Sequence, residues 1–170
     1  MDIEDTNKLN IDFLNEIKSS TFRNRLVREC KKLYKLYPTL TVINNKSNLI
    51  EILITETVDN IENNYGFILN NTYPFTVPKI YYNGEIYIEL LRLKDKSEMD
   101  IVKKYKNKDC LCCDSYYCNG NWSPSLSMSD IIDEIKHIVK FKRDILNILF
   151  SNKLKKKYLI DDIDINSYLI

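Results

Sequence analysis

Residues 20–38 carry the clearest periodic pattern of the chain. Apolar side chains recur there at steps of three and four, while arginine and lysine fill the opposite face; the apolar positions are Phe22, Leu26, Cys30, Leu33 and Leu36, with Val27 and Tyr37 beside them. This spacing predicts an amphipathic helix. Pro38 ends it, because proline disfavours the helical conformation in the residue before it. Residues 7–19 predict a further helical stretch upstream.

The central part of the chain follows the pattern of strands. Four segments are rich in β-branched and aromatic residues and are bounded by asparagines or prolines: 39–45, 48–59, 63–71 and 79–82. Such segments favour strands, and the Asn83-Gly84 pair that follows the last of them is a strong turn signal. We therefore expect an antiparallel meander of three or four strands.

Helical periodicity returns at residues 127–150, where Ser127 and Asp130 have the spacing of a capping box. Between the strands and this helix, residues 94–108 are highly charged and read as a solvated insertion with one helical segment. Strands grouped between two helices indicate an α+β fold with helices on one face of the sheet.

Composition limits the classes of partner. Hydrophobic residues make up 44% of the 170-residue chain, and 25 basic against 24 acidic side chains leave a net charge of +1. We expect no nucleic-acid partner and no membrane partner, because no charged field attracts either. The first residues lack the pattern of a secretory signal, so we expect a cytoplasmic or nuclear protein whose cysteines are thiols.

Four of the five cysteines of the chain lie in the stretch CLCCDSYYCNGNWSP, residues 110–124. Four soft ligands suit a tetrahedral zinc site, but adjacent cysteines depart from the usual spacing of paired zinc knuckles. We therefore predict no metal ligand and no cofactor, and keep a structural zinc site as an alternative. The four cysteines are Cys110, Cys112, Cys113 and Cys118.

A nucleophilic thiol is the other use of this loop. A cysteine protease also needs a histidine base, and His137 is the single histidine of the chain. Thioester exchange does not need that base, because the acyl group is already activated. Trp122 and Phe75 are expected to be core residues that hold the loop still.

Several motifs, in this order, resemble the ubiquitin-conjugating enzymes (E2). In that family an amphipathic helix leads to a four-strand antiparallel meander, a YPF.PP segment, an active-site CL pair and a WSP.L motif before the next helix. Residues 21–150 carry the counterparts FRNRLVRECKKLYKLYP, YPFTVPKIYY, CL at Cys110-Leu111 and NWSPSLSMSDIIDEI. Residues 1–20 would then be an N-terminal extension and residues 151–170 a C-terminal tail.

The resemblance implies the ubiquitin-conjugating-like fold and a transferase in the ubiquitin-like conjugation pathway. Cys110 would accept ubiquitin or a ubiquitin-like protein as a thioester from an E1 activating enzyme and pass it to a lysine, alone or with an E3 ligase. The first helix, with Arg23, Arg25 and Arg28 on its polar face, would meet the activating enzyme or the ligase.

The chain departs from the family in two ways that bear on the site. The His-Pro-Asn tripeptide is absent, and Asn83 or, second, Asn107 would supply the asparagine that stabilises the oxyanion. Cys112 and Cys113 compete with Cys110 as the nucleophile. The alternative function is a non-catalytic binding or structural protein with the same fold, whose cysteine loop is structural or binds zinc.

Overall fold

The computed structural model describes residues 20–45, 49–118 and 120–158. Its elements follow one another along the chain in the expected α+β order. They are α1 (Ser20–Leu36), β1 (Thr41–Asn45), β2 (Leu49–Val58), β3 (Ile61–Leu69), β4 (Lys79–Tyr82), β5 (Glu85–Ile86), α2 (Tyr87–Leu90), α3 (Lys96–Lys106), the 3-10 helix η2 (Cys112–Asp114) and α4 (Met128–Tyr158). The helix expected at 7–19 lies outside the described residues.

The strands form one antiparallel meander in the order β1-β2-β3-β4-β5. The sheet therefore has five strands where three or four were expected, because the chain after the Asn83-Gly84 turn pairs back on β4 over two residues. The tight turn between β2 and β3 was not predicted from the sequence. Asp59 and Asn60 both have positive φ there, as a two-residue hairpin loop requires.

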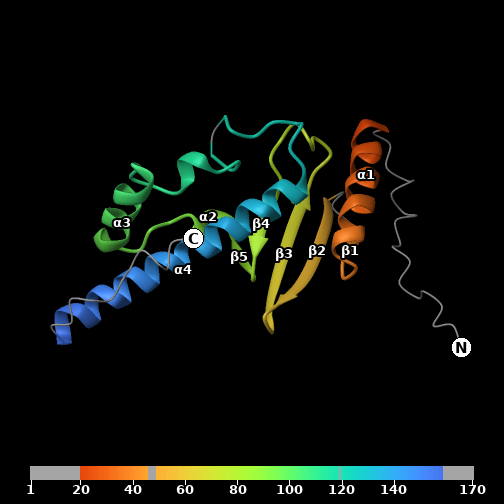
Figure 1. The fold of residues 1–170 in the computed structure, drawn as a ribbon. Coiled ribbons are helices and arrows are strands. Elements are labelled where there is room, and N and C mark those ends of the chain that lie inside the picture. The colour runs from red at the N-terminus through yellow and green to blue at the C-terminus, as the bar shows by residue number, and fades with distance from the viewer. Residues whose placement is uncertain (1–19, 46–48, 119, 159–170) are drawn as a thin grey trace, which may run out of the picture.

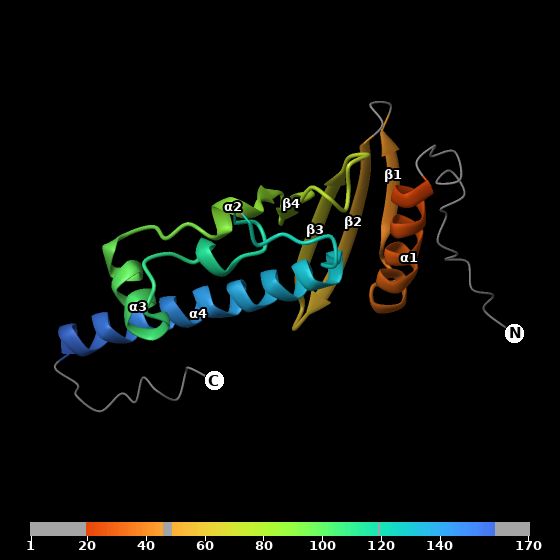
Figure 2. The ribbon, with the colours of Figure 1, turned by 90° about the horizontal axis from the view of Figure 1, so that it is seen from above.

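One face of the sheet forms the core. Ile50, Ile52 and Ile54 alternate along β2 and are buried, and their β3 partners Leu69, Phe67 and Tyr65 are buried too. This period of two places every second residue on the same side of the sheet. Figure 1 shows α1 beside the β1 edge and α4 crossing the sheet, and Figure 2 shows α1 next to β1 while α4 runs from the strands towards α3.

Helix α4 begins with one half of the predicted capping box. The Ser127 N–H donates to Asp130 Oδ2 at 2.7 Å, but the Ser127 hydroxyl donates to the same oxygen, and the Ser127 carbonyl accepts the Asp130 N–H. The helix then continues to Tyr158, across the boundary that the sequence places at residue 150. Its distal part extends beyond the sheet and contacts α3 (Figures 1 and 2).

A buried carboxylate joins the two main helices to the segment after β3. Glu29 on α1 is 4% exposed and accepts hydrogen bonds from the Tyr73 hydroxyl at 2.6 Å and from the Met128 N–H at 2.9 Å. Arg25 pairs with the same carboxylate and also donates to the Leu126 carbonyl. Arg25 is thus committed within the fold and does not belong to a free basic face, which corrects the expectation for the polar side of this helix.

We predict that Glu29→Ala lowers the free energy of unfolding by about 3 kcal/mol, because it leaves the half-buried Arg25 without its counter-charge and removes the acceptor of two other donors. Urea denaturation measures the change. The control is Glu85→Ala on the exposed strand β5, which we expect to stay within about 0.5 kcal/mol of the parent. Equal effects of the two substitutions would contradict the role assigned to Glu29.

Candidate functional site: the cysteine loop

Four of the five cysteines lie on the loop between α3 and α4. The hydrophobic core orients the first turn of this loop. Leu111 is 2% exposed and is buried in the main hydrophobic cluster. Cys110 and Cys112 flank it, so one buried side chain anchors both cysteines. The chain then turns into η2, which closes with a hydrogen bond from the Ser115 N–H to the Cys112 carbonyl.

Asn121 holds the middle of the loop. Its Nδ2 donates to the carbonyls of Cys113 and Ser115, each at 2.9 Å. An amide with two donors can bridge two carbonyls in this way, and it adds to the backbone hydrogen bonds of the loop. Asn121 was not predicted from the sequence, where its place just before Trp122 was the available signal.

Trp122 pins the end of the loop to the segment after β3. Its Nε1–H donates to the Pro74 carbonyl at 2.7 Å, and its ring packs against Tyr73 with the centroids 6.2 Å apart. This confirms that Trp122 holds the loop, although the indole is half-buried. The expectation for Phe75 is wrong: its side chain is 69% exposed, because the bend turns it away from the core.

Glu134 on α4 ties the loop to the rest of the molecule. Its carboxylate accepts hydrogen bonds from the Tyr116 N–H at 2.9 Å and from the Tyr87 hydroxyl. Burial first, and then the hydrogen bond to Glu134, raise the pKa of Tyr87, so the phenol remains the donor.

Neither Glu134 nor Glu29 was predicted from the sequence to have a structural role. Glu29 left a signal, since it falls between Leu26 and Leu33 on the apolar side of α1.

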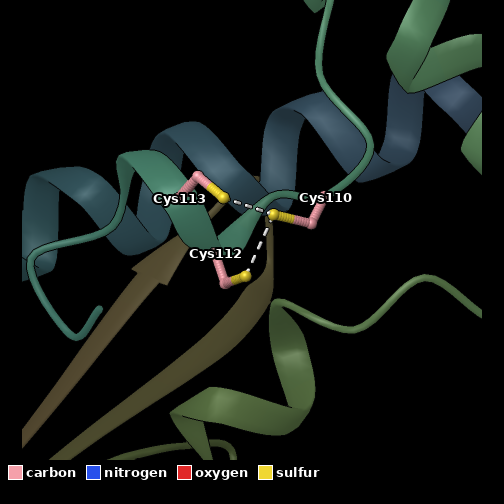
Figure 3. Close-up of side chains that lie close together, drawn as sticks. All are labelled: Cys110, Cys112 and Cys113. Carbon is pink, nitrogen blue, oxygen red and sulfur yellow. Dashed lines mark hydrogen bonds between the residues drawn. The ribbon is translucent and has the colours of Figure 1, made fainter. Parts of the chain in front are cut away.

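Three sulfurs converge at the start of the loop (Figure 3). Cys110 Sγ lies 2.8 Å from Cys113 Sγ and 3.0 Å from Cys112 Sγ, and all three lie within 4.8 Å of one another. All are free thiols. Cys110 and Cys112 are partly exposed and Cys113 is exposed. Within the described part of the chain, this is the single group of three or more histidine, cysteine or acidic side chains close enough to hold one metal ion.

The cluster stabilises negative charge on the central sulfur. Hydrogen bonds from the thiols of Cys113 and Cys112 lower the pKa of Cys110. The same bonds raise the pKa of Cys112 to about 12 and raise that of Cys113. Lys108 lies close enough for the charges of Cys113 and Cys110 to raise its own pKa, after the larger effect of its partner Asp114. Cys110 is therefore the thiol most readily ionised of the three.

A groove of about 370 Å³ borders Cys110 and Cys112. Its other walls come from α2, α3, the segment joining them and Asp109. The other residues that line it are Ile88, Leu91, Arg92, Leu93, Met99 and Asp109. A mainly apolar groove with a few polar groups is the usual form of a ligand-binding site, and here it leads to a thiol.

The other predicted site residues make contacts elsewhere in the described structure. Asn83 sits in the β4–β5 turn, where its Oδ1 accepts the Asn64 N–H at 2.8 Å, and Asn107 ends α3 in the left-handed conformation. His137 is exposed on α4, with Nδ1 at 2.7 Å from the Asp133 carbonyl. Among the described residues, the hydrogen-bond partners of the Cys110 sulfur are Cys113 and Cys112, and none of these three residues is among them. A catalytic role for Asn83 stays a prediction.

Comparisons with known proteins add no relative: no family model, curated protein sequence or solved structure matches the chain. Among the described helices, none combines the length and the apolar composition that crossing a membrane requires.

We predict that alkylation of the native protein separates Cys110 from Cys30. Cys30 is fully buried, and burial is the main cause that raises its pKa to about 12. A buried thiol reacts only when the structure opens, and an opening that costs about 3 kcal/mol slows the reaction about 100-fold. Iodoacetamide followed by peptide mass spectrometry should label Cys110 first and Cys30 only in denaturant. Labelling of Cys30 at the same rate in native buffer would contradict the burial assigned to it.

Proposed function

We propose that the protein is an E2-like transferase that carries ubiquitin or a ubiquitin-like protein as a thioester on Cys110. The observation that carries the proposal is the state of that sulfur: it is partly exposed, it accepts a hydrogen bond from Cys112 and shares one with Cys113, and it borders a groove. These features suit a cysteine that must ionise and meet an acyl group.

The order of the elements supports the same proposal. An amphipathic helix, an antiparallel meander, a Tyr-Pro-Phe bend and a Trp-Ser-Pro motif before a long helix are shared with the ubiquitin-conjugating enzymes. In this chain the bend and the motif touch each other through Trp122 and Pro74. Their contact gives the motif pair a physical purpose, since it holds the loop that bears Cys110.

The proposed reaction has two acyl transfers. In the first, the Cys110 thiolate attacks the carbonyl carbon of a thioester on the activating enzyme; a new C–S bond forms, the old one breaks, and the leaving thiolate takes up a proton. In the second, a neutral lysine amine attacks the carbonyl of the Cys110 thioester. An amide forms, Cys110 leaves as a thiolate and the amine loses a proton.

The groove supplies a path for the modifier. The flexible C-terminus of a ubiquitin-like protein has to lie extended next to the thiol, and a mainly apolar groove walled by α2 and α3 leads there. Arg92 and Asp109 are the charged residues of its lining. We propose that the C-terminal residues of the modifier occupy this groove.

One observation favours the non-catalytic alternative. The carboxamide oxygen of Asn83 is bound to the backbone of β3, and the described contacts of this residue do not reach Cys110. Without an oxyanion donor beside the thioester, transfer to lysine loses a stabilising interaction that is typically worth ~100-fold or more in rate. A binding protein that keeps the fold would need no such donor.

We predict that the purified protein, incubated with activating enzyme, ATP and ubiquitin or a ubiquitin-like protein, forms an adduct that DTT removes. Cys110→Ala should abolish the adduct. Cys112→Ala and Cys113→Ala should retain it but slow its formation about tenfold each, because a hydrogen bond to a charged acceptor contributes about 1.5 kcal/mol. Non-reducing gels and mass spectrometry of the modified peptide measure these outcomes.

Cys118→Ala is the matched control, since this cysteine lies on the same loop but outside the group of three converging sulfurs. It should form the adduct at the parent rate. An adduct that survives Cys110→Ala and disappears in Cys113→Ala would move the nucleophile to Cys113. The absence of any adduct with every modifier tested would favour the non-catalytic alternative.

A further inference from the structure

We propose that Cys110, Cys112 and Cys113 form a three-thiolate site for a zinc ion, with the fourth position open to solvent or to a ligand in the groove. This site goes beyond the proposed transferase activity and does not depend on it. It rests on the position of three sulfurs in the described structure, whereas the transferase activity rests on the chemistry of one.

The spacing of the sulfurs is close to that of zinc ligands. In a tetrahedral site with Zn–S distances near 2.3 Å, neighbouring sulfurs lie ~3.8 Å apart. The three sulfurs lie within 4.8 Å of one another, and the two closest pairs are 2.8 and 3.0 Å apart. Side-chain adjustments of under about 1 Å would therefore bring them to zinc distances.

The local backbone removes the objection that the sequence raised. Adjacent cysteines on an extended chain point to opposite sides, so Cys112 and Cys113 could not share an ion there. In η2 the chain turns tightly at these residues, and Figure 3 shows both side chains directed at Cys110. The buried Leu111 and the two hydrogen bonds from Asn121 support this turn.

Among the described residues, three side chains form the ligand set. The charge of Cys118 helps to raise the pKa of Cys113, but the Cys118 sulfur lies outside the group. His137 makes a hydrogen bond to the backbone of its own helix. Three protein ligands and one open position are typical of zinc sites that take a further ligand. Cys110 and Cys112 line the groove, so a ligand bound there would have access to such a position.

The charge of the surroundings fits a thiolate site. Three thiolates and one Zn²⁺ carry a net charge of −1, and Lys108 is the neighbouring cation that the charges of Cys110 and Cys113 already influence. Zinc also replaces the protons of the three thiols, so one ion relieves the crowding of two thiols around the third. The ion and an acyl group would compete for Cys110.

The experiment titrates the reduced full-length chain with Co²⁺ and follows the sulfur-to-cobalt charge-transfer band, then displaces the cobalt with Zn²⁺. We expect one equivalent to bind. Each of Cys110→Ser, Cys112→Ser and Cys113→Ser should lower the affinity for zinc at least ~100-fold, since loss even of groups that only support a ligand costs 10–100-fold. Far-UV circular dichroism checks that each variant is folded.

Cys30→Ser in the core and Cys118→Ser on the same loop are the controls, and both should bind one equivalent with the parent affinity. No charge-transfer band, or a band unchanged in Cys112→Ser and Cys113→Ser, would overturn the site. Loss of binding in Cys118→Ser would overturn the three-sulfur assignment. The titration contains no activating enzyme, and the thioester assay is run with a zinc-selective chelator that leaves the Mg²⁺ of the ATP in place. Each proposal is therefore tested by its own measurement, and failure of one does not decide the other.

Discussion

The buried carboxylate of Glu29 is the interaction on which the arrangement of this fold depends. It receives the Met128 N–H at the start of α4 and the hydroxyl of Tyr73, while Arg25 supplies the opposing charge. An acidic group at a helix N-terminus is favoured by the helix dipole and by the free N–H groups there. Burial raises the pKa of Tyr73 and Glu29 raises it further, which keeps this phenol a donor. One side chain thus sets where α1, α4 and the Tyr73 segment meet.

This junction determines where the cysteine loop can lie. The loop leaves α3, contacts α4 through Glu134, and returns to the junction where Trp122 donates to Pro74. The loop is therefore held at Tyr116 and at Trp122 by hydrogen bonds to different parts of the fold, and Leu111 is held by the core. A loop with fixed ends and one buried anchor can present side chains reproducibly to solvent, which is a requirement of a reactive or ligating site.

The chemistry of the loop follows from crowding three thiols at one point. A thiol that accepts hydrogen bonds from two others is the easiest of the three to ionise, and the same closeness makes the group suitable for a soft ion. Both proposals use the same physical property of Cys110, namely its tendency to be a thiolate. They differ in what meets it there: an activated carbonyl carbon or a metal ion.

The sequence by itself determined the elements whose signals are local. The helical period of residues 20–38, the alternation in β2 and the Ser127/Asp130 cap each act within a few residues, and each is found in the structure. The tertiary structure alone decided which distant groups meet. Glu29 reaches Met128 across 99 residues, Trp122 reaches Pro74 across 48, and Phe75 points outward. Such contacts depend on how whole elements pack, which the pattern of neighbouring residues does not encode.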